Sequence, residues 1–302
     1  MLLPLAALLF WATLPHAGRC VPLPLQDEDL LADAVEYTEK NPETLVGLVD
    51  EDVMEGDMLV SYDRNAVDRR WPSTRIPYTI DYTLRYRSDD IKTALNMISR
   101  HTCLVFQQRT NEPDYIFFKV AVGCASYVGF MGGQQELHVG ITCTVGNIVH
   151  EVLHALGFYH EHTRMDRDKY ITIVPDNIMR GHQKNFFIQR GETFQLPYDL
   201  PSIMHYGSTF FSSNGEPTIV AKVRNNNMGQ RFAMTPTDIQ RIRLHYKCDQ
   251  VREVAKLYWW EPEVTPAPVY NVHVFDIKGL PHNTTQSPLG GARNDSSADS
   301  GV

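Results

Sequence analysis

The sequence predicts an α+β fold, because strand-like segments precede most of the helical segments in the central part of the chain. Residues 76–81, IPYTID, alternate apolar and polar side chains, as a half-buried strand does. Residues 114–122, DYIFFKVAV, form a longer apolar run that predicts a buried strand. Residues 147–156 and 235–246 have helical patterns with recognisable ends.

Three helices are expected from their end signals. Ser88 or Asp89 can cap the first helix. Its apolar positions have helical spacing: Ile91, Ala94, Leu95 and Ile98. The second helix stops at Gly157, since glycine readily adopts the left-handed conformation that follows a helix. Thr235 and Pro236 suit the cap and the first turn of the third helix.

Composition divides the chain into four parts. We expect a secretory signal at residues 1–20, an acidic pro-segment at residues 21–64, a folded domain at residues 65–249 and a flexible tail at residues 250–302. Residues 21–64 contain 13 Asp and Glu but only Lys40 and Arg64 as basic residues, a net charge of −11. Because the whole chain carries −8, the remainder is close to neutral, which argues against nucleic acid as a main partner.

The first twenty residues are typical of a secretory signal. The apolar run from Leu2 to Leu14 is too short to span a bilayer. Cleavage after Ala17, Gly18 or Cys20 fits the small residues found there. No later apolar run reaches about 18 residues, so we expect a secreted, extracellular protein without a membrane span.

The cysteine count fits an oxidising compartment. The chain has five cysteines: Cys20, Cys103, Cys124, Cys143 and Cys248. Cleavage after Cys20 would leave four, which can form two disulfides in any of three pairings. One disulfide with two free buried thiols is the alternative.

Residues 150–170, HEVLHALGFYHEHTRMDRDKY, contain four histidines in 21 positions. A metal site, a proton relay, a pH switch or ordinary core and surface histidines could each explain such a run. His150 and His154 lie one turn apart on a helix, since four residues advance it by about 400°. That spacing suits two ligands of one metal ion. Glu151 points about 100° round the helix, where it can reach a metal-bound water without binding the metal.

A third ligand can come from beyond the helix. Gly157 can turn the chain back, so that His160 reaches the same metal ion. Three neutral imidazoles leave a position for water, which is typical of a catalytic zinc site. Zinc brings the pKa of that water near neutral, and Glu151 can then take its proton and pass it to a leaving amine. His162 has no ligand spacing and is interpreted as a packing residue.

Several motifs together resemble one protein family. HEVLHALGFYH matches the metzincin pattern HExxHxxGxxH, and its continuation, EHTRMDRDKY, resembles the astacin family of secreted zinc endopeptidases. SIMHYG, residues 202–207, resembles the Met-turn of that family, and GCASYVG and the later YKC are similar too. The resemblance covers about residues 65–249 and part of the pro-segment.

The resemblance implies a zincin-like fold of the metzincin type. A mixed, twisted sheet would carry an active-site helix, and N- and C-terminal subdomains would flank a cleft. An extended extracellular protein or peptide substrate would pair with an edge strand near Ser126 to Gly133. The implied function is a zinc metalloendopeptidase made as a zymogen. A catalytically inactive zinc-containing module that binds proteins is the alternative.

The resemblance also implies roles for individual residues. The ligands of one zinc ion per subunit would be His150, His154 and His160. Glu151 would be the general base. Tyr206 would neighbour the zinc in the resting enzyme and donate a hydrogen bond to the oxyanion once substrate binds. Met204 would form an apolar floor beneath the metal.

Activation and disulfide pairing follow from the same resemblance. A trypsin-like protease would cleave after Arg64, and the new terminus at Asn65 would meet Glu161. MEGDM, residues 54–58, resembles the family's pro-segment switch, so Asp57 would occupy the open zinc position in the precursor. The implied disulfide pairs are Cys103–Cys248 and Cys124–Cys143.

Three further residues have weaker expectations attached. Arg231 lies where similar proteins build the pocket for the residue after the scissile bond, and it could favour an acidic side chain there. A surface arginine is the alternative for this residue. Asn283 and Asn294 begin glycosylation sequons in the tail.

Overall fold

The computed structural model describes residues 41–43, 53–59, 70–224 and 227–250 of the 302-residue chain. The secretory signal with Cys20, the cleavage site at Arg64 and Asn65, and the tail with Asn283 and Asn294 lie outside these residues. No helix within the described ranges is both long enough and apolar enough to cross a bilayer.

A mixed sheet supports the site from one side. Seven strands of the described residues form it, in the order β1-β2-β6-β7-β5-β3-β4. Their bounds are β1 (Val53–Met54), β2 (Met58–Leu59), β3 (Arg75–Ile80), β4 (Val105–Gln108), β5 (Tyr115–Val120), β6 (Ala125–Tyr127) and β7 (Gln134–Val139). β3, β4, β5 and β7 run parallel, whereas β6 runs antiparallel to β7. The expected α+β class with a mixed sheet is confirmed.

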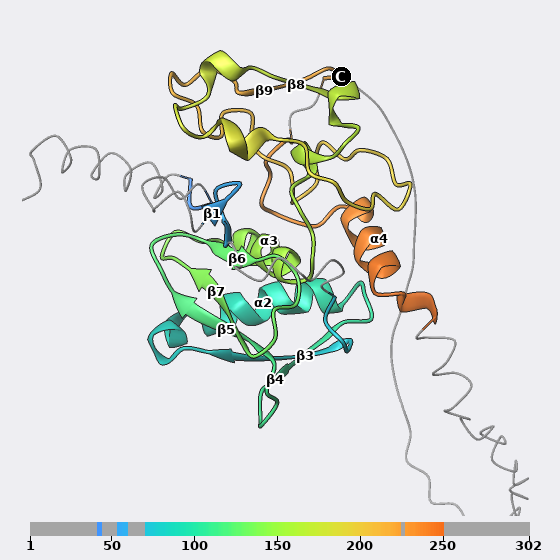
Figure 1. Cartoon of the computed structure of the whole chain (residues 1–302). Coiled ribbons are helices and arrows are strands. Elements are labelled where there is room, and N and C mark those ends of the chain that lie inside the picture. The colour runs from blue at the N-terminus through green and yellow to red at the C-terminus, as the bar shows by residue number, and fades with distance from the viewer. Residues whose placement is uncertain (1–40, 44–52, 60–69, 225–226, 251–302) are drawn as a thin grey trace, which may run out of the picture. The chain divides into compact units, whose positions relative to one another are not determined.

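The strand patterns explain how the sheet packs. In β5, Ile116 and Phe118 are fully buried on one face, as the period of two along a strand requires. Ile116 pairs with Tyr78 of β3 and Gln135 of β7, which fixes the register of three neighbouring strands. The apolar face meets the helices α2 and α3, which lie next to each other beside the sheet (Figure 1).

Helix α2 (Ser88–Ser99) buries its predicted stripe of apolar residues, Ile91, Ala94, Leu95 and Ile98. Both predicted caps are wrong, because Ser88 and Asp89 are already helical and Arg87 precedes the helix without a side-chain cap. Arg87 instead bonds Asp90 and the carbonyl oxygens of Gly140 and Cys143. The preceding 3-10 turn, η1 (Tyr82–Arg87), is capped by Asp81.

Helix α3 (Val145–Ala155) begins two residues earlier than predicted, because Thr144 and Asn147 form a reciprocal capping box. It ends before Gly157, whose φ of 107° only glycine adopts easily. From Gly146 to Ala155 its residues are buried, since the sheet lies on one side and the second half of the chain on the other. The helix therefore holds its side chains rigidly.

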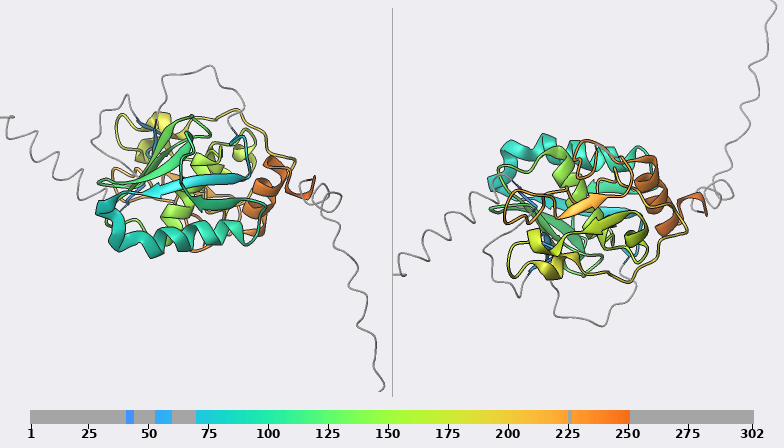
Figure 2. Two further views of the ribbon diagram at one scale, coloured as in Figure 1. Left: turned by 90° about the horizontal axis from the view of Figure 1, so that it is seen from below. Right: turned by 90° about the horizontal axis from the view of Figure 1, so that it is seen from above.

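The described residues from 157 to 250 have little regular structure. They contain the strands β8 (Ile171–Ile173) and β9 (Ile219–Ala221), the helix α4 (Pro236–His245) and four 3-10 turns. These turns are η2 (Glu161–Thr163), η3 (Arg167–Lys169), η4 (Pro175–Asn177) and η5 (Gln183–Phe186). β8 and β9 pair antiparallel over a second apolar cluster, and Figure 2 shows them on the side away from β3. Thr235 caps α4 and Pro236 begins it, as predicted.

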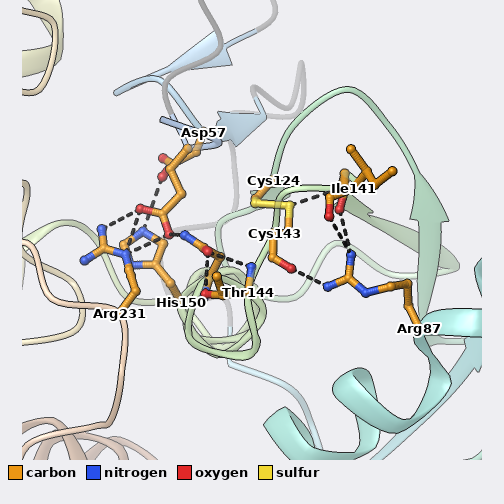
Figure 3. Close-up of a disulfide and its surroundings, with 11 residues drawn as sticks. Asp57, Arg87, Cys124, Ile141, Cys143, Thr144, His150 and Arg231 are labelled. Carbon is orange, nitrogen blue, oxygen red and sulfur yellow. Dashed lines mark hydrogen bonds and ion pairs between the residues drawn. A yellow bond between two sulfur atoms is a disulfide. The ribbon is translucent and has the colours of Figure 1, made fainter. Parts of the chain in front are cut away.

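Two disulfides fasten these parts together. Cys103 pairs with Cys248, and Cys124 pairs with Cys143. This is the pairing that the family resemblance implies. The second disulfide ties β6 to the loop before α3, beside the contacts of Arg87 with that loop (Figure 3).

Candidate metal centre and active site

Three histidine side chains converge on one point. The Nε2 atoms of His150 and His154 are 3.0 Å apart, and that of His160 lies 3.1 and 3.2 Å from them. All three side chains are buried. His150 and His154 come from successive turns of α3, while the bend at Gly157 returns the chain so that His160 faces them.

The outer nitrogens of the two helical histidines already have hydrogen-bond acceptors. Nδ1 of His150 bonds the carbonyl oxygen of Ile203 at 2.7 Å, and Nδ1 of His154 bonds that of Phe158 at 2.7 Å. Each of these Nδ1 atoms must carry the ring hydrogen, because a carbonyl oxygen only accepts. Their Nε2 atoms therefore present lone pairs to each other with no hydrogen between them. A cation between them would resolve this repulsion.

A carboxylate from the acidic segment that is predicted to be a pro-segment completes the group. Asp57 Oδ2 lies 3.3 Å from Nε2 of His150 and of His160, and Oδ1 lies 3.6 Å from Nε2 of His154. The four side chains are buried and form a group that could hold one metal ion. Burial raises the pKa of Asp57 to about 7, so its ionised form needs a cation beside it. Three imidazole nitrogens and a carboxylate oxygen are a donor set that fits zinc.

Glu151 lies on the buried helix next to His150. Neither of its carboxylate oxygens has a hydrogen-bond partner among the described residues. Burial, and then the charges of Asp57 and Glu43, raise the pKa of Glu151 well above its ordinary value. A buried carboxyl group with a raised pKa and free lone pairs can accept a proton at neutral pH.

Tyr206 lies against the third histidine. Its ring centroid is 4.7 Å from that of His160 and 3.7 Å from that of His162. The Tyr206 hydroxyl donates to the carbonyl oxygen of Glu55 in the predicted pro-segment. The carboxylate of Glu55 is also 2.8 Å from Nδ1 of His160. The same turn of the pro-segment therefore holds both side chains.

The turn around Met204 is fixed from two sides. Met204 is buried, and its carbonyl oxygen accepts a hydrogen bond from the Glu161 backbone at 2.9 Å. Ser202 Oγ donates to Asp238 Oδ1 at 2.5 Å, and the Ile203 backbone donates to the other oxygen of Asp238 at 3.0 Å. The first turn of α4 thus positions the turn that supports His150.

Glu161 is buried in a cluster of charges next to a cavity. Its Oε1 atom accepts from Arg241 at 2.7 Å, from Arg164 at 3.1 Å and from the Asp199 backbone at 2.7 Å. Glu161, Arg164 and Arg241 all line a cavity of about 780 Å³, which Met204 also reaches. Asn65 lies outside the described residues, so the predicted contact with a new amino terminus stays a prediction.

The strand predicted as an open substrate edge is covered. Met58 and Leu59 of β2 run parallel to Ser126 and Tyr127 of β6, and the Ser126 backbone donates to Asp57 O at 2.9 Å. The turn before β2 needs a glycine, since Gly56 has a φ of 82° and a Cβ there would lie 2.6 Å from Phe211. The hairpin of β1 and β2 thus brings Asp57 to the histidines from the β6 edge (Figure 3).

Arg231 is not a surface residue, so that alternative is wrong. Its side chain is 10% exposed and pairs with Glu43, whose carboxylate is 2.5 Å away. Glu43 also accepts from Asn147 Nδ2 at 2.6 Å. One oxygen of Glu43 lies within 4.8 Å of ligand atoms of His150 and Glu151. Arg231 therefore lies beside the centre (Figure 3), and its expected role in a substrate pocket stays a prediction.

Sequence reasoning missed three residues at this centre. Glu43 and Glu55 cannot be told apart from the other acids of the pro-segment, because a charged segment has no pattern that marks a buried member. Asn147 had a usable signal, since it follows Thr144 by three positions, as in a capping box.

His162 donates from Nε2 to the Asn185 carbonyl oxygen at 2.9 Å and contributes no atom to the group that could hold a metal.

Comparison with known proteins agrees with the geometry. The family model of astacin, a peptidase family, matches residues 63–247. Blastula protease 10 of Paracentrotus lividus is 40% identical over 201 residues, which cover 62% of this chain and 34% of that protein. Zinc metalloproteinase nas-4 of Caenorhabditis elegans is 39% identical over 204 residues, covering 62% and 63% of the two chains. Meprin A subunit beta of Rattus norvegicus is 37% identical over 211 residues, covering 65% and 30%.

A solved structure is similar as well. High choriolytic enzyme 1, a hatching enzyme zinc-protease from Oryzias latipes, is 36% identical, with a TM-score of 0.57. The match covers 64% of this chain and all of that one. The chain spans less than two thirds of the length of the three curated relatives. A family match over more than half of the chain, together with a three-histidine group suited to zinc, shows that this chain belongs to the astacin family of zinc metallopeptidases.

Proposed function

We propose that the protein is a secreted zinc metalloendopeptidase, made as a zymogen, which hydrolyses internal peptide bonds of extracellular proteins. The observation that carries this proposal is Glu151, a buried carboxyl group with no hydrogen-bond partner among the described residues, next to three converging imidazoles. A binding module has no use for such a carboxyl group, whose burial costs free energy. A peptidase needs it to move a proton.

The residues divide the reaction between them. His150, His154 and His160 would hold one zinc ion, which when bound acts as a Lewis acid and lowers the pKa of water. Glu151 takes the proton of the attacking water and passes it to the leaving amine. The Tyr206 hydroxyl donates a hydrogen bond to the oxyanion that forms on the substrate carbonyl. Met204 fills the apolar space beneath the three histidines.

The pro-segment blocks each of these steps. Asp57 takes the place that water would occupy among the three histidines, as its distances of 3.3 to 3.6 Å to their Nε2 atoms indicate. The backbone carbonyl oxygen of Glu55 accepts the hydrogen bond of the Tyr206 hydroxyl, so this hydroxyl is not available to a substrate. β2 covers the edge of β6, where an extended substrate would add a strand. Removal of one segment therefore releases the metal site, the oxyanion donor and the substrate edge together.

Activation would follow cleavage between Arg64 and Asn65 by a trypsin-like protease. The new amino terminus would enter the cavity next to Glu161, where a buried carboxylate can pair with an ammonium group. Secretion is inferred from the apolar leader at residues 1–20 and fits the two disulfides, which persist in oxidising compartments. After activation, Arg231 would favour an acidic residue directly after the scissile bond.

A peptide-library cleavage assay tests this function. The full-length protein is treated with trypsin, trypsin is then inhibited, and cleavage products are sequenced with and without a zinc chelator. Glu151→Ala is the matched control, since it keeps the three histidines. We expect cleavage that the chelator abolishes and added zinc restores. Cleavage that persists with the chelator, or equally in Glu151→Ala, would contradict the proposal.

A further inference from the structure

The amide of Asn147 is oriented by the helix that it begins. Its Oδ1 atom accepts from the Thr144 backbone at 2.8 Å and from Thr144 Oγ1 at 2.6 Å. Because both lone pairs of this oxygen are used at the helix end, the Nδ2 hydrogens must point away from Thr144. There Nδ2 donates to Glu43 Oε1 at 2.6 Å, and Asn147 is only 5% exposed. The capping box thus presents a hydrogen-bond donor, and no acceptor, to the site.

Arg231 is held just as firmly on the other side of the same carboxylate. Its Nη1 atom donates to the carbonyl oxygens of His205 and Gln230, each at 3.0 Å. Its Nε atom lies 2.7 Å from both oxygens of Glu43. A Cβ on Gly146 would lie 1.7 Å from the Arg231 carbonyl oxygen, so only glycine lets this backbone approach α3 so closely.

The positive charge of Arg231 requires an anion beside it. Burial alone would raise the pKa of Glu43, but the charge of Arg231 and the hydrogen bonds lower it to about 2. Glu43 is therefore ionised, and it is 2% exposed. Once the pro-segment leaves, the Arg231 guanidinium and the Asn147 amide lose the carboxylate that accepts from both of them, so the two donors are left side by side for another acceptor. Glu151 lies close by and would repel an incoming anion, so that anion needs the donors of both Asn147 and Arg231 to offset the repulsion.

We propose that Asn147 and Arg231 form a carboxylate-binding subsite beside Glu151, which Glu43 fills in the precursor and an acidic substrate side chain fills after activation. The inference rests on the proposed function and adds two things to it. Asn147 becomes a specificity-determining residue, because its donor is fixed in place by Thr144. Glu43 becomes a second anchor of the pro-segment, which does not depend on the metal ion.

Binding of a pro-segment peptide tests the subsite without catalysis. The probe is a labelled peptide of residues 41–59, which has no Lys or Arg and so survives trypsin. It is titrated into trypsin-treated Glu151→Ala protein from which the native segment has been removed by gel filtration. We expect Glu43→Gln in the peptide to weaken binding by about 10-fold or more, as for a lost hydrogen bond to a charged group.

Adding Asn147→Ala to the protein completes a double-mutant cycle. We expect the difference in affinity between the unchanged peptide and the Glu43→Gln peptide to shrink several-fold. If Asn147→Ala weakens both peptides by the same factor, Asn147 is only a helix cap and the proposal is overturned. Asn147→Asp is the second variant, since a carboxylate keeps the cap at Thr144 but presents an acceptor to the site. It should bind the unchanged peptide less well than the Glu43→Gln peptide, and the opposite order overturns the proposal.

Cleavage of two peptides that differ only in Glu or Gln after the scissile bond tests the substrate side. Asn147→Ala should lower the Glu-to-Gln ratio of kcat/KM about fivefold or more, a change of about 1 kcal/mol. Thr144→Ala should lower the Glu-to-Gln ratio of kcat/KM by a smaller factor, and Thr144→Ser should restore that ratio. A ratio that Asn147→Ala leaves unchanged overturns the proposal. Failure to cleave either peptide, with a positive binding cycle, contradicts the proposed function alone.

Discussion

His162 and Tyr206 lie face to face, with ring centroids 3.7 Å apart and ring planes 26° from parallel. The Asn185 carbonyl oxygen fixes the His162 ring through Nε2, and Phe186 packs edge-on against Tyr206. Both rings are fully buried. The ring of Tyr206 is therefore set by packing, and its hydroxyl is the part left to act in the site.

Tyr206→Phe keeps this packing and removes only the hydroxyl. If Tyr206 donates to the oxyanion, kcat of the trypsin-activated enzyme should fall on the order of 10²-fold with little change in KM. Tyr198→Phe is a matched control, because that buried hydroxyl bonds His205 and not the pro-segment. Steady-state kinetics on one peptide checks both variants. An unchanged kcat in Tyr206→Phe would remove Tyr206 from catalysis.

Glu151→Ala should abolish hydrolysis and leave metal binding intact. General acid–base catalysis contributes roughly 10²- to 10⁴-fold, so kcat should fall by at least that range. Zinc content stays at one ion per chain, because Glu151 is not part of the group that Asp57 forms with the three histidines. Peptide hydrolysis and metal analysis of the same sample check the loss of activity and the retained zinc. Hydrolysis near the original rate, or loss of zinc, counts against the assigned role.

Asp57→Ala should yield a leaky precursor, which hydrolyses peptides slowly without cleavage because Glu55 still holds the Tyr206 hydroxyl and β2 still covers β6. The variant is made together with Arg64→Gln, so that trypsin-like proteases cannot activate it. Without the Asp57 carboxylate, the three histidines regain an open position for water. Peptide hydrolysis by the uncleaved chain, compared with Arg64→Gln alone, is the measurement. A silent double variant would show that Asp57 is not the switch.

Glu161→Ala should destabilise the fold strongly. The change removes the closest carboxylate of the Arg241 guanidinium, at 2.7 Å, and one of the two carboxylates that pair with Arg164, which costs up to about 3–5 kcal/mol of unfolding free energy. Asp168→Ala is the matched control, because its pair with Arg167 is 68% exposed at the carboxylate and contributes about 0–1 kcal/mol. Urea unfolding at fixed zinc concentration measures both. Equal effects would show that burial of Glu161 adds nothing.

The parts of the fold that depend on local patterns could be predicted. The helix carrying His150 and His154, the break at Gly157 and the start of α4 at Thr235 follow from periodicity, glycine conformation and capping, which involve residues within a few positions of each other. The start of α2 was misplaced, because Ser88 and Asp89 lie inside the helix and do not cap it. The contacts of the preceding Arg87 with the carbonyl oxygens of Gly140 and Cys143, 53 and 56 positions away, have no local pattern.

The sequence by itself determined the class of fold, the three converging histidines and the family, because each depends on short motifs with a fixed spacing. Only the tertiary structure decided that β2 covers β6, that Glu55 reaches Tyr206, and that Glu43 lies between Asn147 and Arg231. The two contacts of Glu43 join residues 104 and 188 positions apart, and each depends on burial and charge pairing across the assembled core. No local pattern encodes such a distance, so a carboxylate in an acidic segment reveals its partner only once the chain has folded around it.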